Sequence, residues 1–369
     1  MKQDFRLLNL PPNFNLESVP ILKKAAQAHR FLAELKGVSG TIPNEVILIN
    51  TLGLQEAKDS SAIENIITTH DELFQEELFA DIASSAAAKE VWRYAVALKK
   101  GFALVKQTQR LTNAHILDIQ AELEGNRAGF RTLPGTVLKN QQTGEIVYTP
   151  PQNSEEVVRL MGNLEQFIND DELSTLDPLV KMALAHYQFE SIHPFYDGNG
   201  RTGRIINILY LVQQGLLNIP VLYLSRYIIQ RKGEYYRRLQ AVRDEEAWEA
   251  WILYMLDGVE QTARQTIAIV QGIGKAMLDY KHRIRDKHRF YSQDLINNLF
   301  RHPYTKIEFL VTDLRVSRLT ATKYLDILSR EGFLHKKKMG RSNYYINTVL
   351  FDLLTKVPEA PMKVPNQAG

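Results

Sequence analysis

The stretch Ser191-Ile-His-Pro-Phe-Tyr-Asp-Gly-Asn-Gly-Arg-Thr-Gly-Arg204 places a histidine, a carboxylate, a Gly-Asn-Gly turn and two arginines directly before an apolar helical run at 205–212. A glycine-rich turn leaves backbone N–H groups free to point at one spot, and the helix that follows directs the positive end of its dipole there. Arg201 and Arg204 are three residues apart, so both side chains project from the first turn of that helix. One guanidinium group can donate two parallel hydrogen bonds to two oxygens of a phosphate. The stretch therefore predicts an anion site that holds phosphate.

The polar residues of this stretch lie between two runs with an apolar helical pattern. Taken alone, each feature is weak. A Gly-Asn-Gly turn is more often an ordinary connection between two elements, and a single histidine near a proline is more often structural. Two arginines on a helix usually lie on its solvent-exposed face. A buried cluster of such groups must be satisfied by partners, and a bound ligand is the simplest partner. The combination therefore favours a ligand site.

The same residues carry a family resemblance. His193-Pro-Phe-Tyr-Asp-Gly-Asn-Gly-Arg-Thr-Gly-Arg204 resembles the active-site motif of the Fic family, His-x-Phe-x-Asp/Glu-Gly-Asn-Gly-Arg-x-x-Arg, at every fixed position. The resemblance implies a mainly α fold, with an all-helical Fic core, a β-hairpin flap and an N-terminal helical extension. It also implies a protein adenylyltransferase, which moves AMP from ATP to a Ser, Thr or Tyr hydroxyl of target proteins and of itself and releases pyrophosphate. Relatives that transfer phosphocholine or phosphate, or that remove AMP, keep other reactions open, and a homodimer is an expectation from the family.

The resemblance implies a role for each polar residue of the stretch. His193 is implied as the general base that takes the proton of the target hydroxyl. Asp197 is implied as the ligand of Mg²⁺, through one carboxylate together with phosphate oxygens. Arg204 is expected at the γ-phosphate, and Tyr235, on a later helix, near the adenine. The implied nucleotide-binding residues are Asp197, Gly198, Asn199, Gly200, Arg201, Arg204 and Tyr235.

Two interpretations fit residues 59–65. From the spacing alone, Ser61 caps the start of a helix and Glu64, three residues on, closes a capping box. By resemblance, Ser60-x-x-x-Glu64-Asn65 is similar to the inhibitory motif Ser/Thr-x-x-x-Glu-Gly/Asn of some Fic proteins. In that interpretation Glu64 pairs with Arg204 through a bidentate contact and inhibits transfer.

Residues 137–148 hold two short β-type runs around a Gln-Gln-Thr-Gly turn and predict a hairpin that ends at Pro150-Pro151. An isolated hairpin is marginal in water, so it has to lie on the rest of the chain. Its position matches the Fic flap, the edge that holds the target segment beside the histidine, and an ordinary surface hairpin is the alternative. The expected target-positioning residues are Val137, Ile146, Val147 and Tyr148.

Composition excludes several classes of site. The 369 residues include no cysteine, which excludes disulfides, thiolate nucleophiles and Cys-ligated zinc. The net charge of +3 is too small to indicate a nucleic-acid partner by itself. No apolar run of about 18 residues occurs and no secretory signal follows Met1, so we expect a cytoplasmic protein without a membrane span.

Residues 290–347 predict a small separate unit. Three short helical patterns, at 293–300, 306–313 and 318–329, precede two strands around a basic turn at 336–341. A helix-turn-helix with a β-wing resembles a winged-helix domain, which binds DNA in some proteins and serves as a docking or dimerisation module in others. The two uses stay equally open. The rival function is therefore a transcriptional regulator in which a Fic-like core senses a ligand.

Helical patterns fill most of the chain outside the flap and the wing, and a Pro-rich tail follows. The predicted domains are an N-terminal helical region with the inhibitory motif at 1–105, a Fic catalytic core at 106–260, a connecting helix at 261–289, a winged-helix domain at 290–350 and a disordered tail at 351–369.

Overall fold

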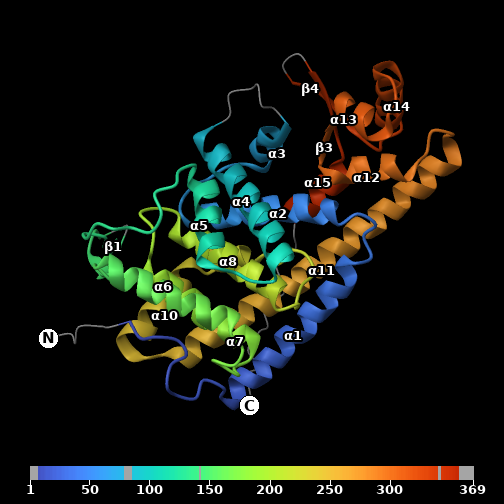
Figure 1. Ribbon diagram of the computed structural model, residues 1–369. Coiled ribbons are helices and arrows are strands. Elements are labelled where there is room, and N and C mark those ends of the chain that lie inside the picture. The colour runs from blue at the N-terminus through green and yellow to red at the C-terminus, as the bar shows by residue number, and fades with distance from the viewer. Residues whose placement is uncertain (1–6, 79–84, 141–142, 340–341, 357–369) are drawn as a thin grey trace. The chain divides into compact units, whose positions relative to one another are not determined.

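The structure is a computed structural model that describes residues 7–78, 85–140, 143–339 and 342–356. Within these residues the protein is mainly helical, with fifteen helices and two small antiparallel sheets (Figure 1). The predicted mainly α fold is confirmed. No helix in this part of the chain is both long and apolar enough to cross a lipid bilayer.

The chain divides into two compact units. Unit 1 comprises Met1–Lys36 and Gly53–Thr262, and unit 2 comprises Gly37–Leu52 and Ala263–Gly369. Three helices contribute residues to both units: α1 (Val19–Ser39), α2 (Glu45–Ile63) and α11 (Trp248–Lys287). The expected connecting helix at 261–289 is therefore only the second part of α11, because buried apolar residues recur at helical spacing from Trp251 onward with no proline to end the helix.

Two helices form the centre of unit 1. α7 (Pro178–Ile192) packs against α8 (Asn199–Gln213), and every residue of α7 after Pro178 is buried. α4 (Ala86–Thr108) and α5 (Asn113–Glu124) pack on α8, while α6 (Ser154–Asn169) packs on α7 (Figure 1). The turn that joins α7 to α8, which carries the motif, is consequently held between two buried helices.

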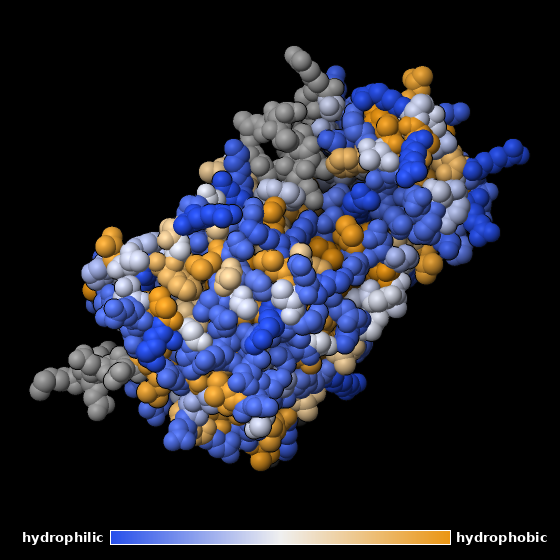
Figure 2. Space-filling view, viewed as in Figure 1, coloured by the Kyte–Doolittle hydropathy of each residue, from blue (hydrophilic) through white to orange (hydrophobic). Residues whose placement is uncertain are grey.

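The other elements of unit 1 surround this centre. The hairpin consists of two antiparallel strands in which Leu138 lies opposite Tyr148, while residues 141 and 142 of its turn lie outside the described residues. On the face in view, hydrophilic residues predominate and hydrophobic ones are scattered in small groups (Figure 2). The remaining elements are α3 (His70–Leu78), β1 (Leu138–Lys139), β2 (Ile146–Tyr148), α9 (Leu224–Gln230) and α10 (Lys232–Glu245).

Unit 2 contains the helices and strands that the sequence predicts for its C-terminal part. Its sheet has the strand order β3-β5-β4, and residues 340 and 341 of the expected wing lie outside the described residues. Residues 351–355 are helical, not part of a disordered tail, because Leu350 and Leu354 are buried on one face of the last helix. The elements are α12 (Gln293–Arg301), β3 (Tyr304–Lys306), α13 (Ile307–Leu314), α14 (Arg318–Arg330), β4 (His335–Met339), β5 (Ser342–Ile346) and α15 (Thr348–Thr355).

Candidate active site

The motif turn is built from two left-handed residues. His193 is the C-cap of α7, with φ 50° and ψ 59°, and Gly198 is the N-cap of α8, with φ 77°. A histidine in this conformation is uncommon, so its surroundings must hold it there. No side-chain hydrogen bond caps the start of α8, which leaves the first N–H groups of that helix open to an anion.

Arg131 fixes the turn from outside the motif. Its side chain, 2% exposed, donates from Nε to the carbonyl oxygen of His193 at 2.8 Å, and its backbone N–H donates to the carbonyl of Pro194 at 2.8 Å. Tyr148 donates its hydroxyl to the carbonyl of Ser191 at 2.9 Å. Sequence reasoning missed Arg131, because a lone arginine in a loop carries no signal of a turn 62 residues away.

The environment of His193 keeps its imidazole neutral. Burial of the ring and the nearby Arg131 charge lower the pKa of His193 to about 4. At neutral pH the ring therefore has a free lone pair and can accept a proton.

Arg204 is bound by the end of α2. The guanidinium, 1% exposed, donates from Nε to Ser60 Oγ at 2.8 Å, and from Nη2 to the Ser60 carbonyl at 2.9 Å and to Glu64 Oε1 at 2.8 Å. The expected bidentate contact with Glu64 is wrong, because Ser60 takes the other donations. A Cβ on Gly200 would overlap Glu64 Oε1, so the carboxylate lies directly on the first turn of α8. Burial acts to raise the pKa of Glu64, but the charge of Arg204 and its hydrogen bond reverse this and lower it.

The capping box predicted around Ser61 is wrong, because α2 ends here instead of another helix beginning. Ile66 donates its N–H to the Ser61 carbonyl and Asn65 donates to the Ala62 carbonyl, both at 3.0 Å, which is the Schellman pattern of a helix C-terminus. Asn65 takes the left-handed position with φ 63°. Glu64 is thus the last residue before a left-handed position that glycine and asparagine adopt most easily, and it is at this position that the motif which the segment resembles carries Gly or Asn.

Arg201 is held by carboxylates that sequence reasoning missed. Its Nη2 donates to Glu124 Oε1 at 2.9 Å and its Nη1 to Glu90 Oε2 at 3.3 Å. A Cβ on Gly198 would overlap Glu124 Oε1, so this carboxylate also lies on the N-terminus of α8. The two glutamates come from α4 and α5, and neither belongs to a motif. Arg201 therefore has two anionic partners on neighbouring helices.

Asp197 and Asn199 play different parts. Asp197 is exposed and its Oδ1 accepts the Gly198 N–H at 2.7 Å, so one carboxylate at the mouth of the site fits Mg²⁺ held jointly with phosphate oxygens. No cluster of three or more metal-ligating side chains occurs among the described residues. Asn199 bonds the N–H and the carbonyl of Phe195 at 2.8 Å each, so its amide shapes the turn, and only its backbone N–H is placed for a phosphate.

The tyrosine expected at the adenine lies in the core. Tyr235 is 1% exposed, and its hydroxyl is 2.8 Å from His186 Nε2. Its neighbour Tyr236 is 45% exposed and lies near Glu64 and Arg204, whose charges affect its pKa. Of the two adjacent tyrosines, Tyr236 is therefore the one with a ring exposed to a ligand, while the role of Tyr235 near an adenine stays a prediction.

The flap residues divide into two groups. Ile146 and Val147 are exposed, whereas Val137 is half-buried. Tyr148 is 8% exposed and donates to the end of α7, so it anchors the hairpin. Ile146 and Val147 are the two expected positions with exposed side chains, and their contact with a target stays a prediction.

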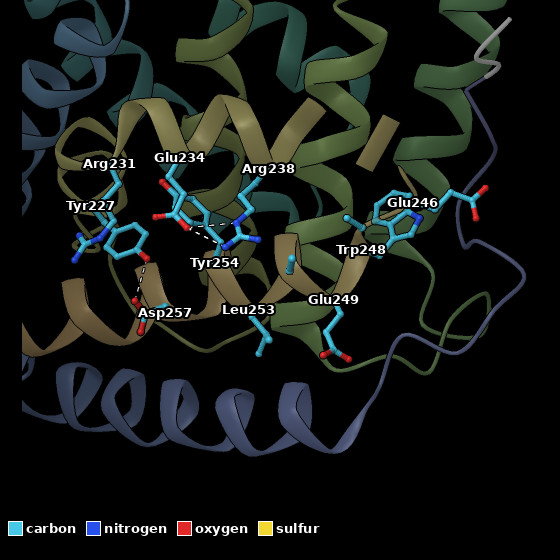
Figure 3. A pocket seen from close by; sticks show the side chains of 12 residues that line it. Tyr227, Arg231, Glu234, Arg238, Glu246, Trp248, Glu249, Leu253, Tyr254 and Asp257 are labelled. Carbon is cyan, nitrogen blue, oxygen red and sulfur yellow. Dashed lines mark hydrogen bonds and ion pairs between the residues drawn. The ribbon is translucent and has the colours of Figure 1, made fainter. Parts of the chain in front are cut away.

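A separate pocket of about 640 Å³ lies among α9, α10 and α11 (Figure 3). Trp248 and Tyr254 line it, and Glu234 pairs with Arg238 at 3.1 Å within it. No residue of the motif stretch lines this pocket.

Three family models match the chain in order. The model described as Fic/DOC family N-terminal matches residues 22–103, and the Fic/DOC family model matches residues 110–211. The model described as "Protein adenylyltransferase SoFic-like, C-terminal domain" matches residues 277–350.

Curated relatives and solved structures agree with these matches. The chain is similar to protein adenylyltransferase Fic of Drosophila erecta, with 28% identity over 45% of this chain and 32% of the relative. It is also similar to protein adenylyltransferase fic-1 of Caenorhabditis elegans, with 34% identity over 24% of this chain and 16% of the relative. The matches thus span at most about a third of these relatives. A Fic family protein from Desulfovibrio desulfuricans G20 shares the fold, with a TM-score of 0.57, 19% identity and coverage of 91% and 98% of the two chains.

Proposed function

Because the chain belongs to the Fic/DOC family, we propose that it is a protein adenylyltransferase, which transfers AMP from ATP to a hydroxyl group of a target protein and of itself. The observation that carries the proposal is the arrangement around the start of α8. A neutral histidine, a helix N-terminus without a side-chain cap and a buried arginine lie on one short turn. These are a base, a phosphate cradle and a counter-charge for a triphosphate.

The reaction needs one bond to form and one to break. The oxygen of a Ser, Thr or Tyr hydroxyl attacks the α-phosphorus of ATP, and its proton passes to the imidazole of His193. The bond from the α-phosphorus to the bridging oxygen breaks, and pyrophosphate leaves in line with the attack. The backbone N–H groups of Asn199 and Gly200 hold the α-phosphate, and Arg204 holds the γ-phosphate. Mg²⁺, bound at Asp197, would neutralise phosphate charge.

Glu64 inhibits this reaction in the proposal. Its carboxylate binds the guanidinium that the γ-phosphate needs and lies on Gly200 at the start of α8. ATP can then enter only with its triphosphate displaced, and small displacements of a reacting group slow a transfer strongly. The exposed side chains of Ile146 and Val147 are placed to hold the target segment, and Tyr236 to stack on the adenine.

One experiment tests the function and its inhibition together. The protein is incubated with ATP labelled at the α-phosphate, and the label on the protein is measured for the parent, Glu64→Gly and Glu64→Gln. We expect both variants to label themselves at least about tenfold faster than the parent, since a charge-assisted contact to Arg204 is lost. Glu64→Gly combined with His193→Ala is the matched control and should show no label. Unlabelled protein from every variant would contradict the proposed function.

A further inference from the structure

A buried carboxylate, Glu190, lies near the arginine that Glu64 holds. It belongs to α7, three residues before His193, and is 9% exposed. Its Oε1 is buried and accepts no hydrogen bond from any residue that the structure describes. A buried carboxylate oxygen without a partner is costly, and its place beside the motif therefore requires a reason.

Two glycines of α8 make room for two carboxylates. Glu64 lies over Gly200, where a side chain would overlap it. Glu190 lies over Gly203, where a Cβ would come within 2.8 Å of Oε1. Arg204 follows directly, so two carboxylates from different elements approach α8 within one turn of the same guanidinium.

The charge on Glu190 depends on what Arg204 binds. Burial raises the pKa of Glu190 to about 7, the charge of Arg204 acts to lower it, and the charge of Glu64 acts to raise it. While Glu64 neutralises Arg204, Glu190 is therefore more readily protonated near neutral pH than an ordinary carboxyl group. The other groups that face Glu190 are Arg243, which also lowers its pKa, and the phenols of Tyr235 and Tyr236.

We propose that Glu190 is a positioning residue, the alternate counter-ion of Arg204, which ionises and holds the guanidinium in the site whenever Glu64 leaves it. Arg204 is 1% exposed, and an unpaired charge at that depth would destabilise the fold strongly. With Glu190 as a reserve partner, the end of α2 can leave Arg204 without exposing a buried charge to an apolar environment.

When Arg204 changes its partner from Glu64 to Glu190, nucleotide binding should depend on pH. This inference rests on the proposed function. A γ-phosphate at Arg204 brings negative charge back beside Glu190. The carboxylate then has to take up a proton. In a variant without the Glu64 charge, ATP binding should therefore be coupled to proton uptake and should weaken as pH rises.

The first test needs no nucleotide. Unfolding by urea is measured for Glu64→Gln, Glu190→Gln and the double variant, which remove charge with little change of shape. Each single variant leaves Arg204 one of these two carboxylates, whereas the double variant removes both. We expect the folding equilibrium constant of the double variant to fall about tenfold below the value that the two single effects predict. A double variant that fails to fold while both single variants fold gives the same answer, and additive effects would overturn the proposal.

A matched pair controls for general loss of buried charge. Glu260 is 5% exposed and pairs with Lys24 at 2.7 Å, an ion pair separate from that of Glu64 with Arg204. Glu64→Gln and Glu260→Gln should therefore combine additively. Coupling of the same size in this pair would also overturn the proposal, because it would show a non-specific effect.

The second test measures ATP affinity between pH 6 and 8. We expect the Kd of Glu64→Gln to rise with pH, by up to about tenfold per unit, while the Kd of the Glu64→Gln and Glu190→Gln double variant keeps only the dependence of ATP itself. Equal slopes would contradict the role of Glu190. Absence of ATP binding in every variant would contradict the proposed function instead, and the urea measurements would still decide on Glu190.

Discussion

At the scale of single residues, the site contains a charged side chain in an environment that ordinarily disfavours its charge. Glu64 follows the last turn of α2, where the negative end of the helix dipole disfavours a carboxylate. It is tolerated there because Arg204 donates to it at 2.8 Å. A residue that opposes its local environment in this way is more readily explained by function than by stability.

The role of His193 leads to a first prediction. In a Glu64→Gly background, His193→Ala should lower the rate of AMP transfer by at least about 100-fold, since a general base contributes about 10²–10⁴-fold. ATP affinity should stay nearly unchanged, because the phosphates are held by other groups. Rates come from labelled ATP and affinities from calorimetry. Equal losses of rate and affinity would make His193 a binding residue.

The two adjacent tyrosines give a second prediction. Tyr236→Ala should weaken ATP binding by about tenfold, because stacking of an aromatic side chain on a base contributes about 1–3 kcal/mol. Tyr235→Phe should leave affinity unchanged and lower stability by about 0.5–1.5 kcal/mol, because the hydroxyl loses its bond to His186. Calorimetry and urea unfolding separate the two effects, and the reverse assignment would restore Tyr235 as the stacking residue.

Residues 193–204 were predictable because consecutive positions carry the motif and the local turn places them. Arg131, Glu90 and Glu124 were not, since each reaches the turn through tertiary packing from an element without a motif. The sequence also did not show that Tyr235 is buried and Tyr236 exposed, because tertiary packing decides which of two neighbours on a helix faces the core.

At the scale of elements, the end of α2 controls where Glu64 points. The helix end depends on Asn65 in the left-handed conformation, and Asn65 Oδ1 also accepts a hydrogen bond from Lys232 at 3.0 Å. The sequence pattern alone suggested a helix start here, because Ser and Glu three apart occur at both ends of helices. The hydrogen bonds of the Schellman turn show that a helix ends here and that none begins.

A third prediction follows from this turn. Asn65→Ala should loosen the end of α2 by about 1 kcal/mol, since a Cβ is disfavoured in the left-handed region. Self-labelling should then rise by up to about fivefold. Asn65→Gly is the matched control, because it loses the same hydrogen bond to Lys232 but still adopts the left-handed conformation easily. This variant should label itself nearly as slowly as the parent. Equal activation by both would assign the effect to Lys232.

At the scale of the whole molecule, the proposed catalytic residues all belong to unit 1. The helical character, the hairpin and the C-terminal helices and strands were predictable from periodicity and turn residues. The continuity of α11 was not, because a 40-residue helix gives no local signal that distinguishes it from two shorter helices. The use of the C-terminal elements, for DNA or for protein, stays a prediction.

A fourth prediction concerns these C-terminal elements. A chain that ends at Arg289, carrying Glu64→Gly, should retain self-labelling within about threefold of the full-length variant, since every proposed site residue lies upstream and belongs to unit 1. Circular dichroism confirms that the truncated chain folds. A folded but inactive chain would show that residues 290–369 are needed for the reaction.

The contact between Glu64 and Arg204 joins two parts of one chain, 140 residues apart. In the proposed mechanism Glu64 is therefore an intramolecular ligand of the nucleotide site, and its effective concentration is fixed by the chain, on the order of millimolar for flexible tethers and higher for a rigid helix end. Dilution cannot release such a ligand. The fraction of inhibited molecules should be the same at nanomolar and micromolar protein, and only a competing ligand or a change in α2 can alter it.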